Sequence, residues 1–206
     1  MKPRIDLTKY ESLYDTFDGG HDRRHLKEVR NFALELAKKY CPDKMEIVYV
    51  AATLHDIGIS VSREDHELHG YEIILKDNEI KEKYSKEECK EILEAVKEHR
   101  ASTGKPISTV AKIVSDADKI SDSTGRAIAR AYEWGLKNIP SLNHEGQLLR
   151  VAYHLKEKFG SNGTGTRLYF EESRNKLNKI YQPIFEALSS YNLEKLNQIL
   201  EEGRNK

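Results

Sequence analysis

The sequence predicts an all-α fold, organised as a single helical bundle with its functional site between facing helices, on three observations. Apolar residues recur at helical spacing along most of the 206-residue chain, and no stretch alternates as a β-strand does. Breaks at Asp18-Gly19-Gly20, at Cys41-Pro42 and at residues 160–166 divide the chain into pieces of helical length. The composition, 38% hydrophobic and 33% charged, is that of a globular protein.

Charge and cysteine usage restrict the partners that the chain is expected to have. Lys+Arg and Asp+Glu both total 34, so no overall field attracts nucleic acid or an anionic membrane. The longest apolar run, residues 47–54, is far too short to span a bilayer, and the N-terminus has no apolar signal core. Cys41 and Cys89 lack a metal-binding spacing and indicate a reducing compartment. We therefore expect a cytoplasmic protein.

The N-terminal half is expected to begin with a helical extension, residues 1–20, whose apolar positions have helical spacing: Leu7, Tyr10, Leu13, Tyr14 and Phe17. A long helix should follow over residues 21–40 and end at Cys41-Pro42. Extending the apolar face of this helix one turn backwards reaches His25. Taken alone, His25 is more often a hydrogen-bonded core histidine than a ligand.

The next helix runs from about Met45 through the apolar stretch 47–54 to the pair His55-Asp56. One interpretation is an ordinary helix end, with Gly58 as the C-cap. The other interpretation is a metal site. Burying an ionised carboxylate is costly, and a divalent metal offsets this cost while also using the histidine as a ligand.

Three further elements lead toward the same core. Ser60 or Ser62 should cap a third helix that contains His66, and residues 76–86 should be a charged connection. A fourth helix over residues 86–98 carries its apolar face directly onto His99. After the loop 100–108, a fifth helix ends its apolar stripe at Asp118.

The C-terminal part is expected to be helical as well. A helix from residue 125 should end near Gly135, followed by a loop over 136–146 and a helix over 147–159. Residues 160–166 form a connection, since a phosphate-binding loop would need a preceding strand and a following Lys-Ser/Thr. Residues 166–200 should be a long helical stretch bent near Pro183. We divide the chain into a core, 21–135, and C-terminal helices, 136–206, that pack on it.

Separate helices thus each carry a histidine or aspartate on an apolar face, at His25, His55-Asp56, His99 and Asp118. One such residue means little, but four converging on one core indicate a site built between facing helices. Imidazoles with carboxylates are a mixed N/O set that suits Mn, Fe, Co, Ni, Zn or Mg. Such a metal lowers the pKa of bound water and polarises a phosphoryl oxygen, as phosphoester hydrolysis requires.

The order of these residues resembles the H…HD…D signature of the HD-domain metal-dependent phosphohydrolases, an all-helical superfamily. The segments GGHDRRHLKEV, AATLHDIG, EAVKEHRAS and DADKISDSTGRAIARAYEWG follow one another over residues 20–135 with the order and gaps of that family. DADK…GRAIAR and the later TGTRLYFEESR are similar to a bacterial and archaeal subgroup that hydrolyses nucleotide phosphates.

The resemblance implies a role for each matching position. The metal ligands are His25, His55, Asp56 and Asp118, and the early His21-Asp22 is a decoy. His66 and His99 match two extra ligand positions of two-metal members, but Glu98 stands where those members have histidine. We therefore favour one metal. Asp56 would also orient the attacking water, with His99 and His66 contacting phosphate or moving protons.

Four basic residues are candidate phosphate contacts: Lys27, Lys119, Arg126 and Arg130. Each alone is more often an ordinary surface residue, and the motif context favours Lys119 and Arg130. The expected function is hydrolysis of a phosphate ester or anhydride, with a nucleotide as the substrate. The alternatives are a non-catalytic nucleotide or metal sensor and a helical scaffold. The base, the number of phosphates, the metal and a homodimeric state are left open.

Overall fold

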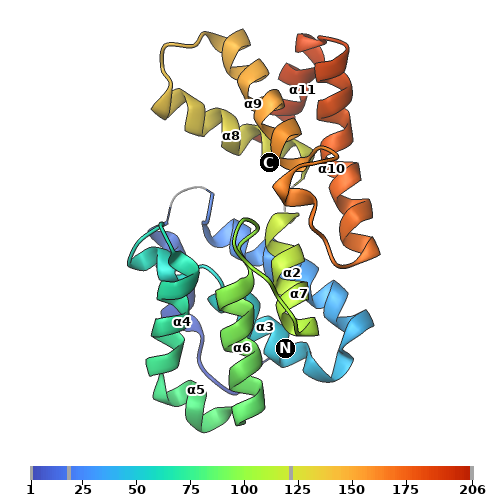
Figure 1. Cartoon of the computed structure of the whole chain (residues 1–206). Coiled ribbons are helices and arrows are strands. Elements are labelled where there is room, and N and C mark those ends of the chain that lie inside the picture. Colours follow the sequence, from blue (N-terminus) through green and yellow to red (C-terminus); the bar gives the residue numbers. More distant parts are fainter. Residues whose placement is uncertain (1, 18–19, 121–122, 205–206) are drawn as a thin grey trace. The chain divides into compact units, whose positions relative to one another are not determined.

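The computed structural model describes residues 2–17, 20–120 and 123–204, so the predicted break at Asp18-Gly19 lies outside the described residues. The described residues form helices and contain no strand, which confirms the all-α class (Figure 1). No described helix combines the length and apolarity needed to cross a membrane. The chain divides into two compact units, residues 1–121 and 122–206.

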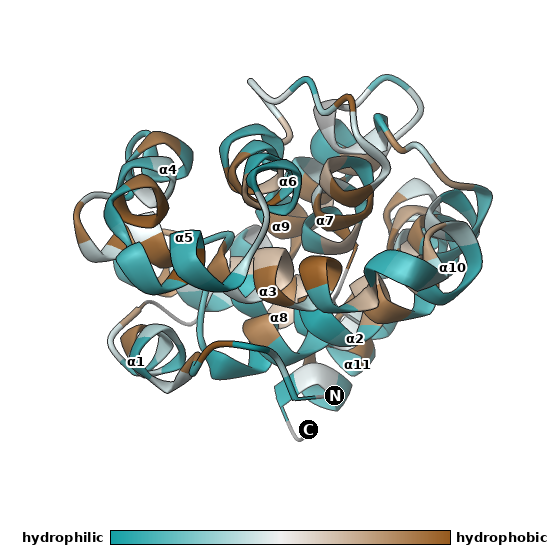
Figure 2. Ribbon diagram, turned by 90° about the horizontal axis from the view of Figure 1, so that it is seen from below, coloured by the Kyte–Doolittle hydropathy of each residue, from teal (hydrophilic) through white to brown (hydrophobic). Residues whose placement is uncertain are grey.

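The described part of the first unit contains seven α-helices: α1 (Thr8–Glu11), α2 (Arg23–Tyr40), α3 (Met45–Leu54), α4 (His66–Lys76), α5 (Asn78–Lys83), α6 (Lys86–Glu98) and α7 (Thr109–Lys119). Three short 3-10 turns accompany them: η1 (Ser12–Asp15), η2 (Pro42–Lys44) and η3 (Ile57–Ser60). α3 is the central helix, because it packs against α2, α6 and α7. Every residue from 47 to 54 except Tyr49 is buried, and Figure 2 shows α3 as mostly hydrophobic and α5 as mostly hydrophilic.

The functional pair lies just beyond α3 and not within a helix. α3 ends at Leu54, and Asp56 directly precedes η3. The interpretation of Gly58 as a helix cap is therefore wrong. Gly58 lies inside η3, where a Cβ atom would collide with the backbone of His66 and of Gly70 in α4. The glycine lets η3 approach α4 closely and so brings Asp56 beside His66.

Two other predictions about this unit are corrected by the structure. α4 begins at His66 after Asp65, whose left-handed φ of 53° is uncommon for a residue with a side chain, and neither Ser60 nor Ser62 caps it. The charged connection over residues 76–86 contains α5, capped by Asp77. α5 escapes sequence analysis because Asn-Glu-Ile-Lys-Glu-Lys has a single apolar residue and no visible periodicity.

The second unit contains four described α-helices: α8 (Thr124–Asn138), α9 (His144–Phe159), α10 (Glu171–Ser189) and α11 (Leu193–Arg204), with η4 (Thr164–Thr166) before α10. α8 packs against α9, α10 and α11, within the second compact unit. The division of the chain at residue 135 stays a prediction. Gly135 lies within α8, and Pro183 lies within α10. The stretch expected over 166–200 is two helices, separated where Tyr191 adopts a φ of 52°. Packing of the C-terminal helices on the core stays a prediction.

Asp77 connects α1 with α5 and provides a test of the fold. Its Oδ1 accepts from the Ile80 backbone N–H at 3.0 Å, and its Oδ2 accepts from Lys9 Nζ at 2.8 Å and from the Tyr10 hydroxyl. Replacing Asp77 with Ala should lower the free energy of unfolding by about 1–2 kcal/mol, measured by urea denaturation at pH 7. Asp77→Asn keeps an N-cap acceptor and should lose less, and the exposed Asp43→Ala should change nothing.

The contribution of Asp77 should also depend on pH. Burial raises the pKa of Asp77, but the hydrogen bonds from Lys9, Tyr10 and Ile80 outweigh it and hold the pKa at about 2. Because this value is below that of the unfolded chain, the stabilisation is complete above about pH 5 and is lost as the pH falls toward 2. An unchanged difference between Asp77→Ala and the wild type at pH 7 and at pH 3 would contradict the assignment.

Candidate metal centre

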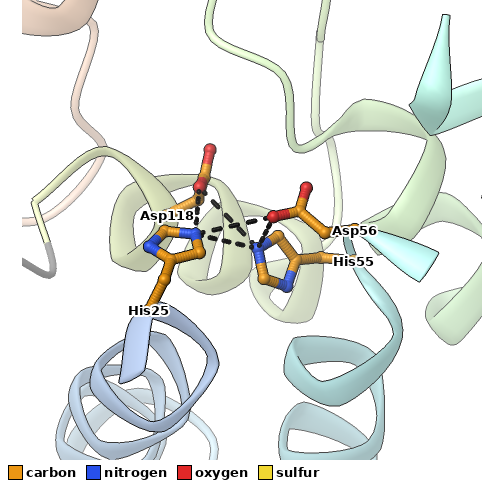
Figure 3. Close-up of side chains that lie close together, drawn as sticks. All are labelled: His25, His55, Asp56 and Asp118. Carbon is orange, nitrogen blue, oxygen red and sulfur yellow. Dashed lines mark hydrogen bonds and ion pairs between the residues drawn. The ribbon is translucent and has the colours of Figure 1, made fainter. Parts of the chain in front are cut away.

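Four side chains meet at one point of the first unit (Figure 3). They are His25 from α2, His55 and Asp56 from the turn after α3, and Asp118 from α7. One ligand atom of each lies within 4.8 Å of the corresponding atoms of the other three. His55 Nε2 is 3.0 Å from Asp56 Oδ2, and His25 Nε2 is 3.2 Å from Asp118 Oδ1. The structure thus brings together the four residues expected to bind metal.

Burial makes this arrangement costly without a cation. His25, His55 and Asp56 are at most 3% exposed, whereas the Asp118 side chain is 23% exposed and marks the open side of the site. No lysine or arginine among the described residues forms an ion pair with Asp56 or Asp118. Asp56 Oδ2 is buried and, while the neighbouring imidazoles are neutral, accepts no hydrogen bond. An uncompensated buried carboxylate costs several kcal/mol, so the donor set fits a divalent metal.

The histidines are oriented as metal ligands are. The Nδ1 atoms lie close to backbone carbonyl oxygens: His55 at 2.9 Å from Ala52, His66 at 3.1 Å from Arg63 and His99 at 2.7 Å from Val96. A neutral imidazole that donates from Nδ1 carries its lone pair on Nε2. Each of these Nε2 atoms faces Asp56. Lone pairs and carboxylates that converge in this way repel one another unless a proton or a metal lies between them.

A second set of ligands uses the other oxygen of Asp56. His66 Nε2 and His99 Nε2 lie 3.3 Å and 3.5 Å from Asp56 Oδ1, and 3.1 Å from each other. These three residues also form a group that could hold a metal ion. Asp56 therefore lies between two groups of imidazoles, one on each carboxylate oxygen. The expected roles of His66 and His99 in phosphate contact or proton transfer stay predictions, and the geometry adds a second cation as an alternative.

Electrostatic effects keep both carboxylates charged. Burial raises the pKa of Asp56, but the positive charge of a protonated His55 and the hydrogen bonds that His55, His66 and His99 donate when protonated on Nε2 hold this pKa well below its usual range. Burial likewise raises the pKa of Asp118, but the hydrogen bond from His25 and the charge of His55 lower it below its ordinary value. Burial lowers the pKa of His55, yet Asp56 beside it raises this pKa overall. The centre therefore attracts positive charge, whether protons or metal.

Comparison with known proteins agrees with this geometry. A model of the family described as HD domain matches residues 23–122.

Residues 23–122 are an HD domain.

The HD domain includes every residue of both ligand sets. A crystal structure described as a predicted HD superfamily hydrolase, from an uncultured Thermotogales bacterium, is similar to this chain with a TM-score of 0.60 and 21% identity. The similarity covers 93% of each chain and, at this identity, shows a shared fold. No curated protein gives a sequence match.

Tyr14 is a residue of the centre that sequence analysis missed. It is 1% exposed, and its hydroxyl donates to the Thr53 carbonyl at 2.9 Å while accepting from the Asp56 backbone N–H at 3.3 Å. These are two backbone groups that the end of α3 leaves without helical partners. Tyr14 therefore fixes the turn that presents the His-Asp pair to the metal position. In the sequence it is one apolar position among several in a short amphipathic segment, and nothing distinguishes it.

Glu67 and Arg100 form a second support, beside His66 and His99. Glu67 is 4% exposed, and Arg100 Nη1 donates to its two carboxylate oxygens at 3.2 Å and 3.1 Å. The Thr103 hydroxyl donates to Glu67 Oε1 at 3.2 Å. Arg100 follows His99 directly and Glu67 follows His66, so this pair ties α4 to the loop after α6. The signal that the sequence offered for this pair is that Glu67 and Arg100 directly follow the two histidines.

The predicted basic residues lie in different surroundings. Lys119 Nζ donates to Ser115 Oγ at 2.9 Å, and Ser115 Oγ donates to the His99 carbonyl at 3.0 Å. Lys27 is exposed on α2. Arg126 and Arg130 are half-buried on α8 of the second unit. Phosphate contact by these four residues stays a prediction. Asp22 of the predicted decoy caps α2 by accepting from the backbone N–H groups of Arg24 and His25.

Tyr14→Phe tests the support of the turn. The substitution keeps the ring and removes the hydroxyl, leaving the Thr53 carbonyl and the Asp56 N–H unpaired. Because this hydroxyl orients the turn that carries His55 and Asp56, the affinity for Mn²⁺ should fall about 10-fold to 100-fold, measured by calorimetric titration of chelator-treated protein. Tyr153→Phe, at a tyrosine that is 60% exposed, is the matched control and should keep wild-type affinity. Equal affinities for Tyr14→Phe and the wild type would show that the turn forms without this hydroxyl.

Proposed function

We propose that the chain is a divalent-metal-dependent phosphohydrolase. The observation that carries the proposal is the Asp56 carboxylate, buried and charged, with His25 and His55 on one oxygen and His66 and His99 on the other. When bound at this centre, a divalent cation would lower the pKa of a water molecule and polarise a phosphoryl oxygen. The HD domain match and the similarity to a structure described as a predicted hydrolase support this class of reaction.

Four residues would hold the cation: His25, His55, Asp56 and Asp118. Two nitrogens with two carboxylates suit Mn, Fe, Co, Ni, Zn or Mg, and differ from the closed thiolate sites of structural zinc. Four protein ligands leave coordination positions for water and substrate in a six-coordinate ion. The exposed edge of Asp118 gives these positions a side open to solvent.

Proton transfer would fall to the second set of residues. Asp56 Oδ1 would accept a hydrogen bond from the attacking water and orient it. His99 or His66 would then take its proton on Nε2, the nitrogen that each imidazole leaves free. The contact between Nδ1 and a backbone carbonyl oxygen stabilises the imidazolium that results. His66, whose side chain is 11% exposed against 1% for His99, is the better placed to pass the proton to solvent.

The substrate would be a small phosphorylated molecule, and we expect a nucleotide because of the similarity of DADK…GRAIAR to the nucleotide-hydrolysing subgroup. Lys119 and Arg130 are the favoured phosphate contacts, with Lys27 and Arg126 as further candidates. Lys119 follows Asp118 directly and donates to Ser115, whose hydroxyl bonds the backbone of His99. This chain of contacts keeps its ammonium group close to the catalytic histidine.

The alternative from another class is a non-catalytic sensor that binds a nucleotide or a metal in the same pocket. A pure binding module has no need for a general base beside an open coordination position. The pair His66 and His99 on Asp56 Oδ1 therefore favours the enzyme.

Substitutions in the two sets should separate the roles. With the nucleotide or phosphomonoester turned over fastest in a panel assayed with Mn²⁺, Co²⁺, Ni²⁺ and Mg²⁺, Asp56→Asn should lower kcat by about 10² or more. His99→Ala should lower kcat about 10²-fold while the first equivalent of metal stays bound. Arg130→Ala should mainly raise KM, because a contact equal in ground and transition states affects binding alone.

His69→Ala is the matched control, since His69 is a half-buried histidine of α4 outside both ligand sets. It should keep wild-type kinetics and metal content. The sensor hypothesis expects the fully metallated wild type to turn over none of the phosphate compounds with any of the four metals, while a nucleotide still binds saturably. That outcome would overturn the proposed function.

A further inference from the structure

A cavity of the first unit lies between α4, α5 and α6, and none of the residues that line it belongs to either ligand set. Figure 1 shows α4 and α6 side by side, with α5 at the end where the chain passes from one to the other. The cavity has a volume of about 610 Å³, within the range of small-molecule sites. Ile74, Ile80 and Tyr84 form a buried apolar floor, and the more exposed Leu75 and Leu93 extend it toward solvent.

Lysines surround this apolar floor. Lys81 comes from α5, and Lys86, Lys90 and Lys97 come from α6. Positions 86, 90 and 97 recur at intervals of four and seven, so the three lysines lie along one face of α6. All four lysines are exposed, and none forms an ion pair with another described residue. Lys97 Nζ lies 5.6 Å from the centre of the Tyr71 ring, which also lines the cavity.

The two carboxylates that line the cavity are already engaged elsewhere. Glu94 Oε1 accepts from the backbone N–H groups of Ile107 and Ser108 at 2.8 Å and 3.0 Å. Glu98 Oε2 accepts from the backbone N–H of Lys105 at 2.8 Å. Both carboxylates therefore serve the loop between α6 and α7 and do not pair with the lysines. The lining combines apolar surface with four lysines that form no ion pair among the described residues.

We propose that this cavity binds a small anionic amphiphile, such as an aliphatic or aromatic carboxylate. Its apolar part would lie on Ile74, Leu75 and Leu93, where it removes exposed apolar surface from water. Its carboxylate would lie beside Lys90 and Lys97, and Lys86 would add to the positive charge around it. A cation or a neutral amphiphile of the same length gains the apolar contact alone, so the site discriminates by charge. The proposal is independent of the phosphohydrolase function, since it uses no residue of the metal centre.

Cys89 provides a local reporter of occupancy. It lines the cavity and is half-buried, with Sγ 3.7 Å and 3.6 Å from the carbonyl oxygens of Ile80 and Tyr84. The other cysteine, Cys41, is buried and lies outside the lining. Alkylation of the metallated wild-type chain by iodoacetamide can therefore be followed at each cysteine by peptide mass spectrometry. The measurement needs an alkaline buffer, because burial raises the pKa of the Cys89 thiol.

The experiment compares sub-micellar decanoate with decyltrimethylammonium and decanol. Decanoate should slow the alkylation of Cys89 saturably, and the cationic and neutral probes should protect much more weakly. In the double variant Lys90→Gln/Lys97→Gln the half-saturating concentration of decanoate should rise about tenfold, as the loss of two exposed charge contacts implies. Lys38→Gln removes an exposed lysine of α2 and should leave protection unchanged.

Three results would overturn the proposal. They are no protection by decanoate, equal protection by decyltrimethylammonium, and protection that is unchanged in the double variant. Circular dichroism of each variant serves to check that the fold is retained. The lysines are exposed and form no ion pair with a described residue, so the fold does not depend on them.

Discussion

The structure of the first unit depends on one electrostatic constraint, the burial of the charged Asp56 carboxylate among imidazoles. A buried, uncompensated carboxylate costs several kcal/mol, a large part of the 5–15 kcal/mol that holds a domain folded. His55 and His66 lie beside its two oxygens, yet Oδ2 accepts no hydrogen bond while these imidazoles are neutral, and the nearby Asp118 adds a second negative charge. The neighbouring helices thus assemble a cluster of side chains that could hold a cation, and the apolar packing of α3 against α2, α6 and α7 holds this cluster in place.

The geometry of the site depends on the residue at which α3 ends. α3 stops at Leu54, and the backbone groups that it leaves unpaired are taken by the Tyr14 hydroxyl and by the His55 ring. Gly58 then allows the following turn to touch the backbone of α4. The same turn thus places His55 and Asp56 beside His25 and Asp118. It also places Asp56 against His66 and His99.

Much of this could be predicted from the sequence, and the misses have physical causes. α2, α6 and α7 carry long apolar stripes, so the stripes themselves point to His25, His99 and Asp118. α5 has too few residues for a period, and the left-handed Asp65 hides the start of α4. Tyr14 was missed because its role depends on contacts with Thr53 and Asp56, which lie 39 and 42 positions further along the chain. No local sequence pattern contains such contacts. His66 lies beside Asp56 because Gly58 lets η3 contact α4. The local sequence does not reveal this contact either.

Anomalous diffraction from crystals grown with Mn²⁺ tests the central claim most directly. Data collected on both sides of the manganese absorption edge locate the ion without reference to activity. We expect a peak bounded by His25 Nε2, His55 Nε2, Asp56 Oδ2 and Asp118 Oδ1. A second peak at Asp56 Oδ1 would assign His66 and His99 as ligands as well. If no peak is found and these side chains are hydrogen-bonded directly to one another, protons and not a metal balance the buried carboxylates.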